Sequence, residues 1–390
     1  MSQVTGTPRV GLVGGGQLAR MTAAPAAALG VNLRLLAADP EESAAQVICD
    51  VVLGSHTDLA ALSELAENCS VITFDHEHVP PTHLRALEEA GIGVQPSSAA
   101  LVHAQDKITM REAVEAAGLP TPRWRHDFGA DDLPTVGEAL GWPLVLKVSR
   151  GGYDGRGVWV VDDEAQARDV MSSTELAPGA SWLAEELVPF TRELAAQVAR
   201  SPSGQAVAYP VVRTVQVDGM CSEVVAPCPD LPEATALEAQ QIGLRVAEAL
   251  GVTGMLAVEL FDSPKGLLIN ELAMRPHNSG HWSIDGAVTS QFENHLRAVL
   301  DLPLGDPRSI APWSVMVNVV GPRDIEGLPA LTEAFRHVMA RDPGVHVHLY
   351  GKALRPGRKL GHVTVVSDDL DDALARAHHA ADYLMGVIDE

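Results

Sequence analysis

Short apolar runs alternate with helix-length amphipathic segments along the first hundred residues. The runs are bounded by Gly, Pro or Asp, which is typical of buried strands. We expect strands at 9–13, 33–37, 71–74 and 93–95, and helices at 19–29 and 82–90. This alternation predicts an α/β fold that begins with a small doubly wound parallel sheet. Another helix is expected over 97–117, ended by Gly118-Leu-Pro-Thr-Pro122.

The rest of the pattern divides into two further units. The second is expected to contain a helix at 163–171 and strands at 144–148, 158–161, 182–188 and 193–199. The third is expected to begin with residues 209–217 and to contain helices at 233–250, 290–300 and 369–386, and strands at 255–262, 267–271, 314–320, 345–350 and 362–366. We therefore predict domains at 1–103, 104–200 and 201–390, with a small α+β extension from about 312.

Composition narrows the possible partners. The 390 residues include 28 Lys or Arg and 51 Asp or Glu, so the formal net charge is −23. Such a charge argues against nucleic acid or anionic membrane as a partner, and no apolar run reaches membrane-spanning length. An anionic small substrate would need local clusters of cations. The four cysteines show no CxxC spacing, which favours free thiols in a cytosolic protein.

The segment from Lys147 to Gly157 joins two apolar runs and contains four glycines. Glycines let backbone N–H groups crowd around an anion, and Lys147 and Arg156 add positive charge. Tyr153 and Asp154 lie inside the same loop. A flexible hairpin tip is the alternative for glycines alone, but the two framing cations favour an anion-binding loop. It is not a Walker loop, because its lysine precedes the glycines.

The N-terminal glycine turn leaves a rival interpretation open. Gly14-Gly-Gly-Gln17-Leu18 follows the first strand, and Asp39 follows the second, as in a loose dinucleotide-binding fingerprint. A nicotinamide dehydrogenase is therefore one alternative, and a non-catalytic nucleotide-binding module is another. The fingerprint is weak, because any strand-to-helix crossover favours glycines at this point.

Glu259 and Glu271 form the most informative pair. They lie on two apolar strands joined by Asp262-Ser-Pro-Lys-Gly266, and a hairpin centred near Lys265 places them opposite each other. Opposed, desolvated carboxylates are stabilised by a hard cation, so we expect a magnesium site. Asn270 could supply another oxygen if the strand ends there. Two glutamates at a solvent-exposed edge are the alternative.

Three other polar stretches carry candidate site residues. Glu185, Glu186, Leu187 and Val188 end a strand and could meet a nucleotide base, with Glu193 near a ribose, although a charged surface strand looks the same. His277 and His281 have the i, i+4 spacing of zinc ligands, but Pro276 disfavours a helix there, and a substrate-lining loop is the better interpretation.

The third stretch, residues 352–359, holds four cations. Pro356-Gly357 forces a tight turn that gathers these like charges, and a phosphate would relieve their repulsion. We expect Lys352, Arg358 and Lys359 to hold a substrate phosphate or ribose. A solvated turn is the alternative.

Four motifs together resemble a known family. They are Gly14-Gly-Gly-Gln-Leu-Ala-Arg-Met21, Gly151-Gly-Tyr-Asp-Gly-Arg-Gly157, Asn270-Glu-Leu-Ala-Met-Arg-Pro-His-Asn-Ser-Gly-His-Trp282 and Arg355-Pro-Gly-Arg-Lys-Leu-Gly-His362. They are similar to motifs of the N5-carboxyaminoimidazole ribonucleotide synthetases, which belong to the ATP-grasp superfamily. The resemblance spans nearly the whole chain, and its second and third motifs are highly specific.

The resemblance implies an ATP-grasp fold, a cytoplasmic homodimer, and carboxylation of 5-aminoimidazole ribonucleotide through carboxyphosphate in purine biosynthesis. ATP, Mg²⁺ and bicarbonate are the implied reactants. The implied ATP-site residues are Lys107, Lys147, Gly152, Tyr153, Asp154, Gly155, Arg156, Gly157, Glu185, Glu186, Leu187, Val188, Glu193, Gln216, Asn270 and Glu271. The implied metal ligands are Glu259, Glu271 and Asn270. The implied ribonucleotide-site residues are Gln17, Leu18, Glu77, Tyr153, Asp154, Arg156, Arg275, His277, Ser279, Lys352, Arg358 and Lys359.

Asp154, Arg156 and His277 are the implied catalytic groups, with Asp154 and His277 orienting the amine or accepting its proton. Lys107, Met274, Asp75 and Gln216 stand where the family often has arginine, proline, a longer acid and histidine. Formate-dependent glycinamide ribonucleotide transformylase is the nearest family that could be confused with this one.

Overall fold

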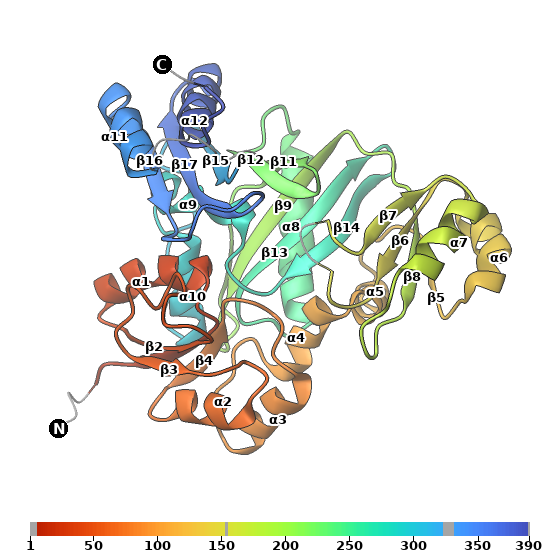
Figure 1. The fold of residues 1–390 in the computed structure, drawn as a ribbon, viewed down its shortest axis with the longest axis horizontal. Helices are drawn as coiled ribbons and strands as arrows, with labels where there is room; N and C mark the ends of the chain where they lie inside the picture. The colour runs from red at the N-terminus through yellow and green to blue at the C-terminus, as the bar shows by residue number, and fades with distance from the viewer. Residues whose placement is uncertain (1–5, 153–154, 323–330, 389–390) are drawn as a thin grey trace.

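A computed structural model of the chain describes residues 6–152, 155–322 and 331–388. These residues form three sheets: an N-terminal sheet, a small sheet and a large sheet. In Figure 1 the N-terminal sheet lies at the lower left, the small sheet at the right, and the C-terminal helices at the upper left. The large sheet joins the other parts.

The N-terminal sheet is parallel, as the alternating pattern predicted. Its order is β3-β2-β1-β4, with β1 at Arg9–Val13, β2 at Asn32–Ala37, β3 at Val51–Leu53 and β4 at Val71–Phe74. Its helices are α1 (Gln17–Leu29), α2 (Leu59–Ala66) and α3 (Pro81–Glu89). The sequence analysis missed β3 and α2. The strand expected at 93–95 is a single bridge from Val94 to Ile72, because Gly93 and Pro96 flank it closely.

The single helix expected over 97–117 is two helices. They are α4 (Ser98–Gln105) and α5 (Lys107–Ala116). Asp106 between them is extended, and its carboxylate accepts hydrogen bonds from the N–H groups of Ile108 and Thr109. This N-cap replaces the continuing helical hydrogen bonds and starts a new helix at Lys107. The break also fixes the direction in which Lys107 leaves the helix.

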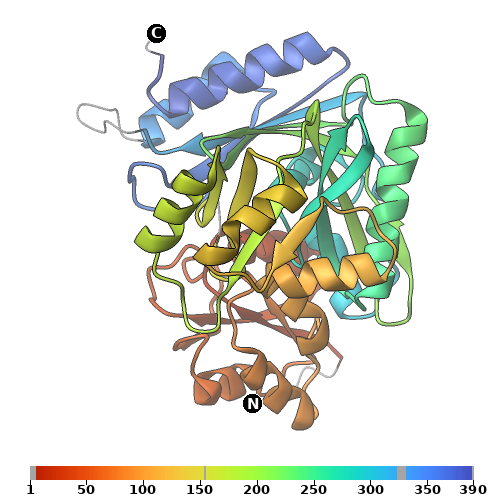
Figure 2. The same ribbon diagram turned by 90° about the vertical axis from the view of Figure 1, so that its right-hand side faces the viewer.

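The small sheet is antiparallel, with helices on one face. Its order is β5-β8-β6-β7, with β5 at Trp124–His126, β6 at Leu144–Val148, β7 at Val158–Val161 and β8 at Trp182–Glu186. Helices α6 (Leu133–Leu140), which follows the short turn η1 (Ala130–Asp132), and α7 (Glu164–Ser173) pack on one face and face the viewer in Figure 2. Lys147 pairs with Val158, so both point to the opposite, uncovered face.

The large sheet contains nine strands in the order β14-β13-β9-β11-β12-β15-β17-β16, with β10 beside β9. Their bounds are β9 Arg192–Arg200, β10 Ala206–Ala208, β11 Val212–Val217, β12 Met220–Ala226, β13 Gly254–Ser263, β14 Gly266–Ala273, β15 Trp313–Val320, β16 His346–Leu349 and β17 Lys359–Ser367. The pattern placed the strand near 193–199 in the second unit. It instead pairs with β13 and β11 in this sheet, because its alternate residues match that core.

The C-terminal extension continues the same sheet. Strand β15 pairs with β12, and β17 pairs with β15, so no separate sheet forms among the described residues after 312. The remaining helices are α8 (Glu233–Ala249), the short turn η2 (Asn278–Gly280), α9 (Ser283–Gly286), α10 (Gln291–Val299), α11 (Leu331–Arg341) and α12 (Leu370–Leu384). Helix α12 packs on β15 and β17, while α8 packs on β9 and β13.

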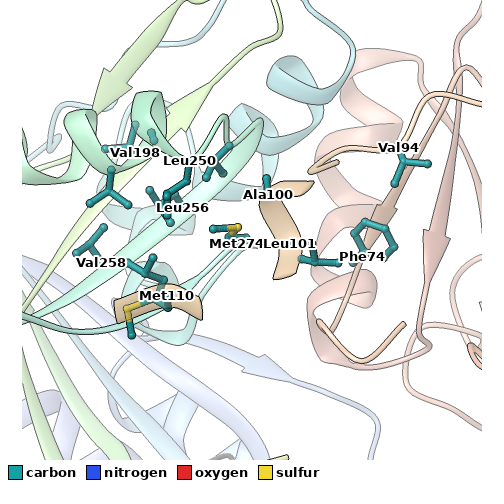
Figure 3. Close-up of a cluster of buried hydrophobic side chains, with 14 of the residues drawn as sticks. Phe74, Val94, Ala100, Leu101, Met110, Val198, Leu250, Leu256, Val258 and Met274 are labelled. Carbon is teal, nitrogen blue, oxygen red and sulfur yellow. The ribbon is translucent and has the colours of Figure 1, made fainter. Parts of the chain in front are cut away.

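One hydrophobic cluster joins the N-terminal sheet to the large sheet. Figure 3 shows it running from Phe74 and Val94, through Leu101 of α4, to Met274 and Leu256. All five side chains are at most 4% exposed. Burial of such side chains contributes about 1.5–3 kcal/mol each, so this cluster makes the two parts a common platform for the residues above it.

No helix in the described part of the chain is both long enough and apolar enough to cross a membrane.

The attachment of α12 generates a pH prediction. His378 Nε2 lies 2.6 Å from Glu223 Oε2 on β12, and this hydrogen bond raises the pKa of His378. Burial opposes the charge of Glu223, but bonds from His378 and Arg213 hold its pKa below the usual range. The ion pair therefore stabilises the fold fully between about pH 4.5 and 6.5, and its contribution is lost as pH rises through the raised pKa of His378.

We expect His378→Gln to lower the melting temperature more at pH 6 than at pH 8.5. The pair is partly exposed, so the difference should correspond to about 0.2–1 kcal/mol. Differential scanning calorimetry at both pH values measures it. An equal loss at both pH values would show that His378 packs without titrating.

Candidate active site

The hairpin of β13 and β14 places Glu259 directly opposite Glu271, as the position of the turn predicted. The side chain of Glu259 alternates with those that face α8, so it points to the other face of the large sheet. Burial, followed by the charge of Glu271, raises the pKa of Glu259 to about 8. The pair therefore stores the repulsion that a bound cation would relieve.

A bulge in β14 brings Asn270 into the same site. Glu259 pairs with Glu271 and Leu260 with Ile269, so Asn270 is the extra residue between the two pairs. Its Oδ1 lies 3.2 Å from Lys147 Nζ. The expectation that Asn270 joins the pair only if the strand ends there is wrong, because β14 continues to Ala273. The bulge, which a period-two pattern does not reveal, turns the side chain instead.

Two lysines approach these carboxylates from different elements. Lys107 Nζ, at the start of α5, lies 2.6 Å from Glu271 Oε1. Burial disfavours the charge of Glu271, but Lys107 outweighs it and lowers the pKa of this carboxyl. Lys147 Nζ, at the end of β6, lies 2.7 Å from Glu185 Oε2. Cations and carboxylates thus alternate across the space between the small sheet and the hairpin.

Glu185 has cationic partners on both of its oxygens. Arg111 Nε lies 2.6 Å from Oε1, and Lys147 holds Oε2. Burial would raise the pKa of Glu185, but Arg111 and Lys147 lower it to about 2. Contact of this carboxylate with a base remains a prediction, although its geometry is that of an anchor for Lys147. Glu186 bonds to Arg123 instead, at 2.8 Å.

Apolar side chains line the uncovered face of the small sheet near these groups. Val158 and Val160 of β7 are exposed there, although valines in strands are usually buried. Leu187 and Phe190, which follow β8, are also exposed, and Phe190 stacks on Phe261 with ring centroids 4.7 Å apart. A small cavity of about 60 Å³ adjoins Glu186 and Val188. These surfaces suit a flat aromatic ligand.

Two further predicted residues lie on neighbouring strands. Glu193 of β9 is partly buried, and burial raises its pKa. It also raises the pKa of Glu259 through its charge. Gln216 lies at a bulge in β11, opposite Cys221. Glu193 therefore lies on β9, which pairs with β13, and Gln216 lies on β11, which leads to the turn that the glycine loop approaches.

The glycine loop approaches the turn between β11 and β12. Gly155 has φ +75°, and a Cβ on it would lie 2.9 Å from the Cα of Gly219, so this position requires glycine. A Cβ on Gly152 would lie 2.6 Å from the carbonyl oxygen of Arg156. Tyr153 and Asp154, both predicted site residues, lie outside the described residues.

The N-terminal glycine turn already holds an anion. The carboxylate of Asp75 accepts hydrogen bonds from the N–H groups of Gly16 (3.1 Å) and Ala19 (2.8 Å) at the start of α1. Burial raises the pKa of Asp75 to about 6, and these bonds oppose the shift. A Cβ on Gly15 would meet the carboxylate of Glu42. Two carboxylates thus occupy the place of a dinucleotide pyrophosphate, which contradicts the nicotinamide alternative.

The neighbouring groups connect this turn to the hairpin. Gln17 accepts a hydrogen bond from Lys352, and Leu18 is buried beneath it. Glu77 binds Arg275 Nε at 2.7 Å, two residues after the end of β14. Gln17 and Lys352 thus meet across the whole length of the chain. The predicted ribonucleotide residues from both ends come together here.

His277 lies next to Glu259, and Ser279 bonds to His277. His277 Nε2 is 3.7 Å from Glu259 Oε1, and His277 Nδ1 is 2.8 Å from Ser279 Oγ. Burial, followed by the charges of Arg275 and Lys359, lowers the pKa of His277 to about 3. The imidazole is therefore neutral at pH 7. His281 contacts Gln291 instead, and no three potential metal-ligating side chains of His, Cys, Asp or Glu gather in the described residues.

The cationic loop, which is the stretch of residues 352–359, faces Glu259 and His277 in part. Lys359 begins β17, and its charge affects the pKa values of Glu259 and His277. Arg358 donates to the carbonyl of Ala353, and Arg355 is exposed. Burial lowers the pKa of Lys352, the charge of Asp75 opposes this shift, and the charges of Arg358 and Lys359 add to it.

Arg111 and Asp106 were missed by the sequence analysis. Asp106 caps α5 and also binds Arg150 Nε at 2.6 Å, next to the glycine loop. Arg111 is buried and donates to Glu185 and to the carbonyls of Ile269 and Asn270. A signal was present, because Arg111 follows Lys107 by four residues and so lies on the same helix face.

Comparisons with known proteins agree along the whole chain. Residues 7–105 match the ribonucleotide synthetase preATP-grasp domain, residues 112–292 the ATP-grasp domain, and residues 314–376 the phosphoribosylaminoimidazole carboxylase C-terminal domain. N5-carboxyaminoimidazole ribonucleotide synthase of Mycobacterium tuberculosis (strain ATCC 25618 / H37Rv) is 53% identical over 97% of this chain and 88% of the relative. That of Corynebacterium ammoniagenes is 44% identical over 98% and 94%.

Solved structures indicate the same family as the sequence comparisons. N5-carboxyaminoimidazole ribonucleotide synthetase from Thermus thermophilus superimposes with a TM-score of 0.85 at 37% identity, covering 98% of this chain and 99% of that one. The Aspergillus clavatus enzyme in complex with ADP and 5-aminoimidazole ribonucleotide gives a TM-score of 0.87 at 31% identity, covering 97% and 98%. With a relative more than half identical over nearly its whole length, the chain belongs to the N5-carboxyaminoimidazole ribonucleotide synthase family of ATP-grasp ligases.

Proposed function

We propose that this chain uses ATP and bicarbonate to carboxylate the exocyclic amine of 5-aminoimidazole ribonucleotide, releasing ADP and phosphate in the cytoplasmic synthesis of purines. The observation that carries the proposal is the pairing of Glu259 with Glu271 at a bulge, faced by Lys107 and Lys147. This arrangement suits the transfer of a phosphoryl group, and relatives at 53% identity carry the corresponding name.

The hairpin residues fit a magnesium ion. Two carboxylate groups and one amide oxygen form a hard, all-oxygen donor set, and the pKa of Glu259 is raised first by burial and then by the repulsion of Glu271, which a cation would relieve. Glu259, Glu271 and Asn270 would hold the ion. Bound there, Mg²⁺ supplies charge neutralisation for the phosphoryl oxygens.

The lysines would position the phosphates. Lys107 would exchange its bond to Glu271 for phosphate oxygens, and Lys147 is held in place by Glu185. Gly152, Gly155, Arg156 and Gly157 would add backbone N–H groups and one cation. The exposed Val158 and Val160, with the main chain of residues 186–188, would bind the base, and Glu193 and Gln216 would lie near the sugar.

The ribonucleotide would bind between the N-terminal turn and the cationic loop. Because Asp75 fills the start of α1, the substrate phosphate requires other donors. Lys352, Arg358 and Lys359 are those donors in this proposal, with Gln17 and Leu18 below the sugar. Glu77 holds Arg275 beside the site. The homodimer implied by the resemblance is part of the same proposal, and light scattering on the purified chain tests it.

The neutral His277 would orient the amine. A group with a pKa of about 3 is a weak base, so we assign it hydrogen bonding, with Ser279 fixing its ring. Asp154 and Arg156 are the other proposed catalytic groups. Carboxyphosphate, formed as bicarbonate takes the γ-phosphoryl group of ATP, must be shielded from water until the amine reacts either with it or with the CO₂ that it releases together with phosphate.

A coupled assay of phosphate release tests the assignment. We expect release from ATP to require 5-aminoimidazole ribonucleotide, bicarbonate and Mg²⁺ together. Formate with glycinamide ribonucleotide serves as the control for the neighbouring transformylase reaction. Turnover with that pair, and none with the first, would refute the proposed substrate.

Glu259→Gln should retain the fold and lose turnover. The raised pKa of Glu259 means that its carboxyl is largely protonated at pH 7, so glutamine is close in shape and charge. We expect an unchanged or raised melting temperature without nucleotide, and a fall in kcat of about 100-fold or more at saturating ATP. Calorimetry and a magnesium titration of the rate measure both. Near-normal turnover at low Mg²⁺ would contradict the metal assignment.

Lys359→Ala and Arg358→Ala should each raise KM for the ribonucleotide by about 10-fold or more, because each removes a charge-assisted bond to phosphate. KM for ATP should change much less. Arg245→Ala is a charge-matched control, since Arg245 lies on α8 and bonds to the carbonyl of Ala117. Equal changes in the KM values for both substrates would instead support the alternative that residues 352–359 form a solvated turn.

A further inference from the structure

Arg111 touches both halves of the candidate active site. Its guanidinium donates from Nε to Glu185 on β8 (2.6 Å), from one terminal nitrogen to the carbonyl of Ile269 (2.8 Å), and from the other to the carbonyl of Asn270 (2.9 Å). Its side chain is 1% exposed. A planar guanidinium has donors in fixed directions, so these three bonds fix the distance and orientation between their acceptors.

The acceptors belong to groups that must act together. Glu185 holds Lys147 through its other oxygen, at 2.7 Å. Asn270 is the extra residue of the bulge that sets Asn270 and Glu271 opposite Glu259, and Ile269 is the paired residue just before it. Arg111 therefore links a lysine of the small sheet to the carboxylates of the large sheet, through one rigid side chain.

We propose that Arg111 is a positioning residue for phosphoryl transfer. Arg111 holds the small sheet in a fixed position relative to the β14 bulge, so that Lys147 and the Glu259–Glu271 pair lie within reach of the same phosphate group. The inference rests on the proposed function for the identity of the reaction. The geometric part of the inference does not depend on that function, because ADP binding with and without Mg²⁺ tests it in the absence of the ribonucleotide.

The energetics of buried ions separate this role from that of a stabilising ion pair. A buried salt bridge adds little net stability, because both charges lose their hydration. Three bonds from one cation to two different elements do, however, specify one relative placement. Misplacement of reacting groups by about 1 Å costs about 100-fold in rate. Removing Arg111 leaves Glu185 buried with Lys147 as its remaining cation, which should also destabilise the fold, so the loss in catalysis has to be measured at temperatures at which the variant stays folded.

Arg123 offers a matched control. It makes the same set of bonds, to one carboxylate oxygen of Glu186 (2.8 Å) and to the successive carbonyls of Ala139 (2.8 Å) and Leu140 (2.9 Å). All of these acceptors lie on or beside the small sheet. Arg123→Met therefore removes a fork with the same donors and acceptor types, from a side chain that is 57% exposed, without separating the two halves of the site.

The test compares Arg111→Met, Arg111→Lys and Arg123→Met with the wild type, below their measured melting temperatures. We expect Arg111→Met to lower kcat by about 10- to 100-fold, with KM for the ribonucleotide within about twofold. Arg111→Lys, which keeps the charge but not the fork, should recover part of the loss. Arg123→Met should stay within about twofold of the wild type.

Isothermal titration of ADP, with Mg²⁺ and with EDTA, gives a readout that needs no turnover. The factor by which Mg²⁺ tightens ADP binding should shrink in Arg111→Met and persist in Arg123→Met. Equal factors in these two folded variants, with equal kcat, would overturn the inference. If Arg111→Met does not fold, Arg111→Lys decides by the same two readouts, and wild-type values for it would overturn the inference. Magnesium-coupled ADP binding without ribonucleotide-dependent turnover would refute the proposed substrate alone.

Discussion

Two carboxylates held face to face on an antiparallel strand pair are the constraint on which the candidate site depends. Glu259 and Glu271 repel each other, and apolar strands surround them. The chain tolerates this through unequal ionisation, since Lys107 keeps Glu271 charged while burial favours the neutral form of Glu259. Lys107 of α5 then takes a position set by Glu271, while Lys147 of β6 is held by Glu185 and Asn270. The same imbalance makes the hairpin suitable for a divalent cation.

The second constraint is the binding of anionic substrates by a chain with a net charge of −23. The start of α1 would ordinarily attract a phosphate, but the carboxylate of Asp75 occupies it. Positive charge is instead concentrated where chain segments distant in sequence meet. Lys352, near the C-terminal end of the chain, donates a hydrogen bond to Gln17, and the charge of Lys359 adds to burial and the charge of Arg275 in lowering the pKa of His277. Local cations can thus attract anions inside a negative overall field.

A common platform of packed sheets holds these distant segments in place relative to one another. The C-terminal extension continues the large sheet through β12 and β15, and the hydrophobic cluster of Figure 3 joins the N-terminal sheet to the strands beneath the hairpin. The small sheet, in contrast, connects to this platform near the site through ionic groups, among them Arg111 and Lys147. Apolar packing therefore fixes the N-terminal sheet against the large sheet, while oriented hydrogen bonds help to fix the small sheet against it.

The sequence by itself determined what depends on near neighbours. Period-two alternation around a Ser-Pro-Lys-Gly turn placed Glu259 opposite Glu271, and glycines framed by cations predicted an anion-binding loop. Four motifs identified the family. Local patterns did not reveal the bulge at Asn270, which occurs within an otherwise regular strand, or the break at Asp106, which depends on one side-chain cap.

Tertiary structure decided the long-range contacts. The membership of β9 in the large sheet depends on its pairing with β13, more than fifty residues later. The blocked start of α1 depends on Asp75, and the role of Arg111 depends on acceptors 74 to 159 residues away. These partners are chosen by chain topology and desolvation, because a buried donor must find an acceptor wherever the fold brings one. Their distances along the sequence carry no periodic signal.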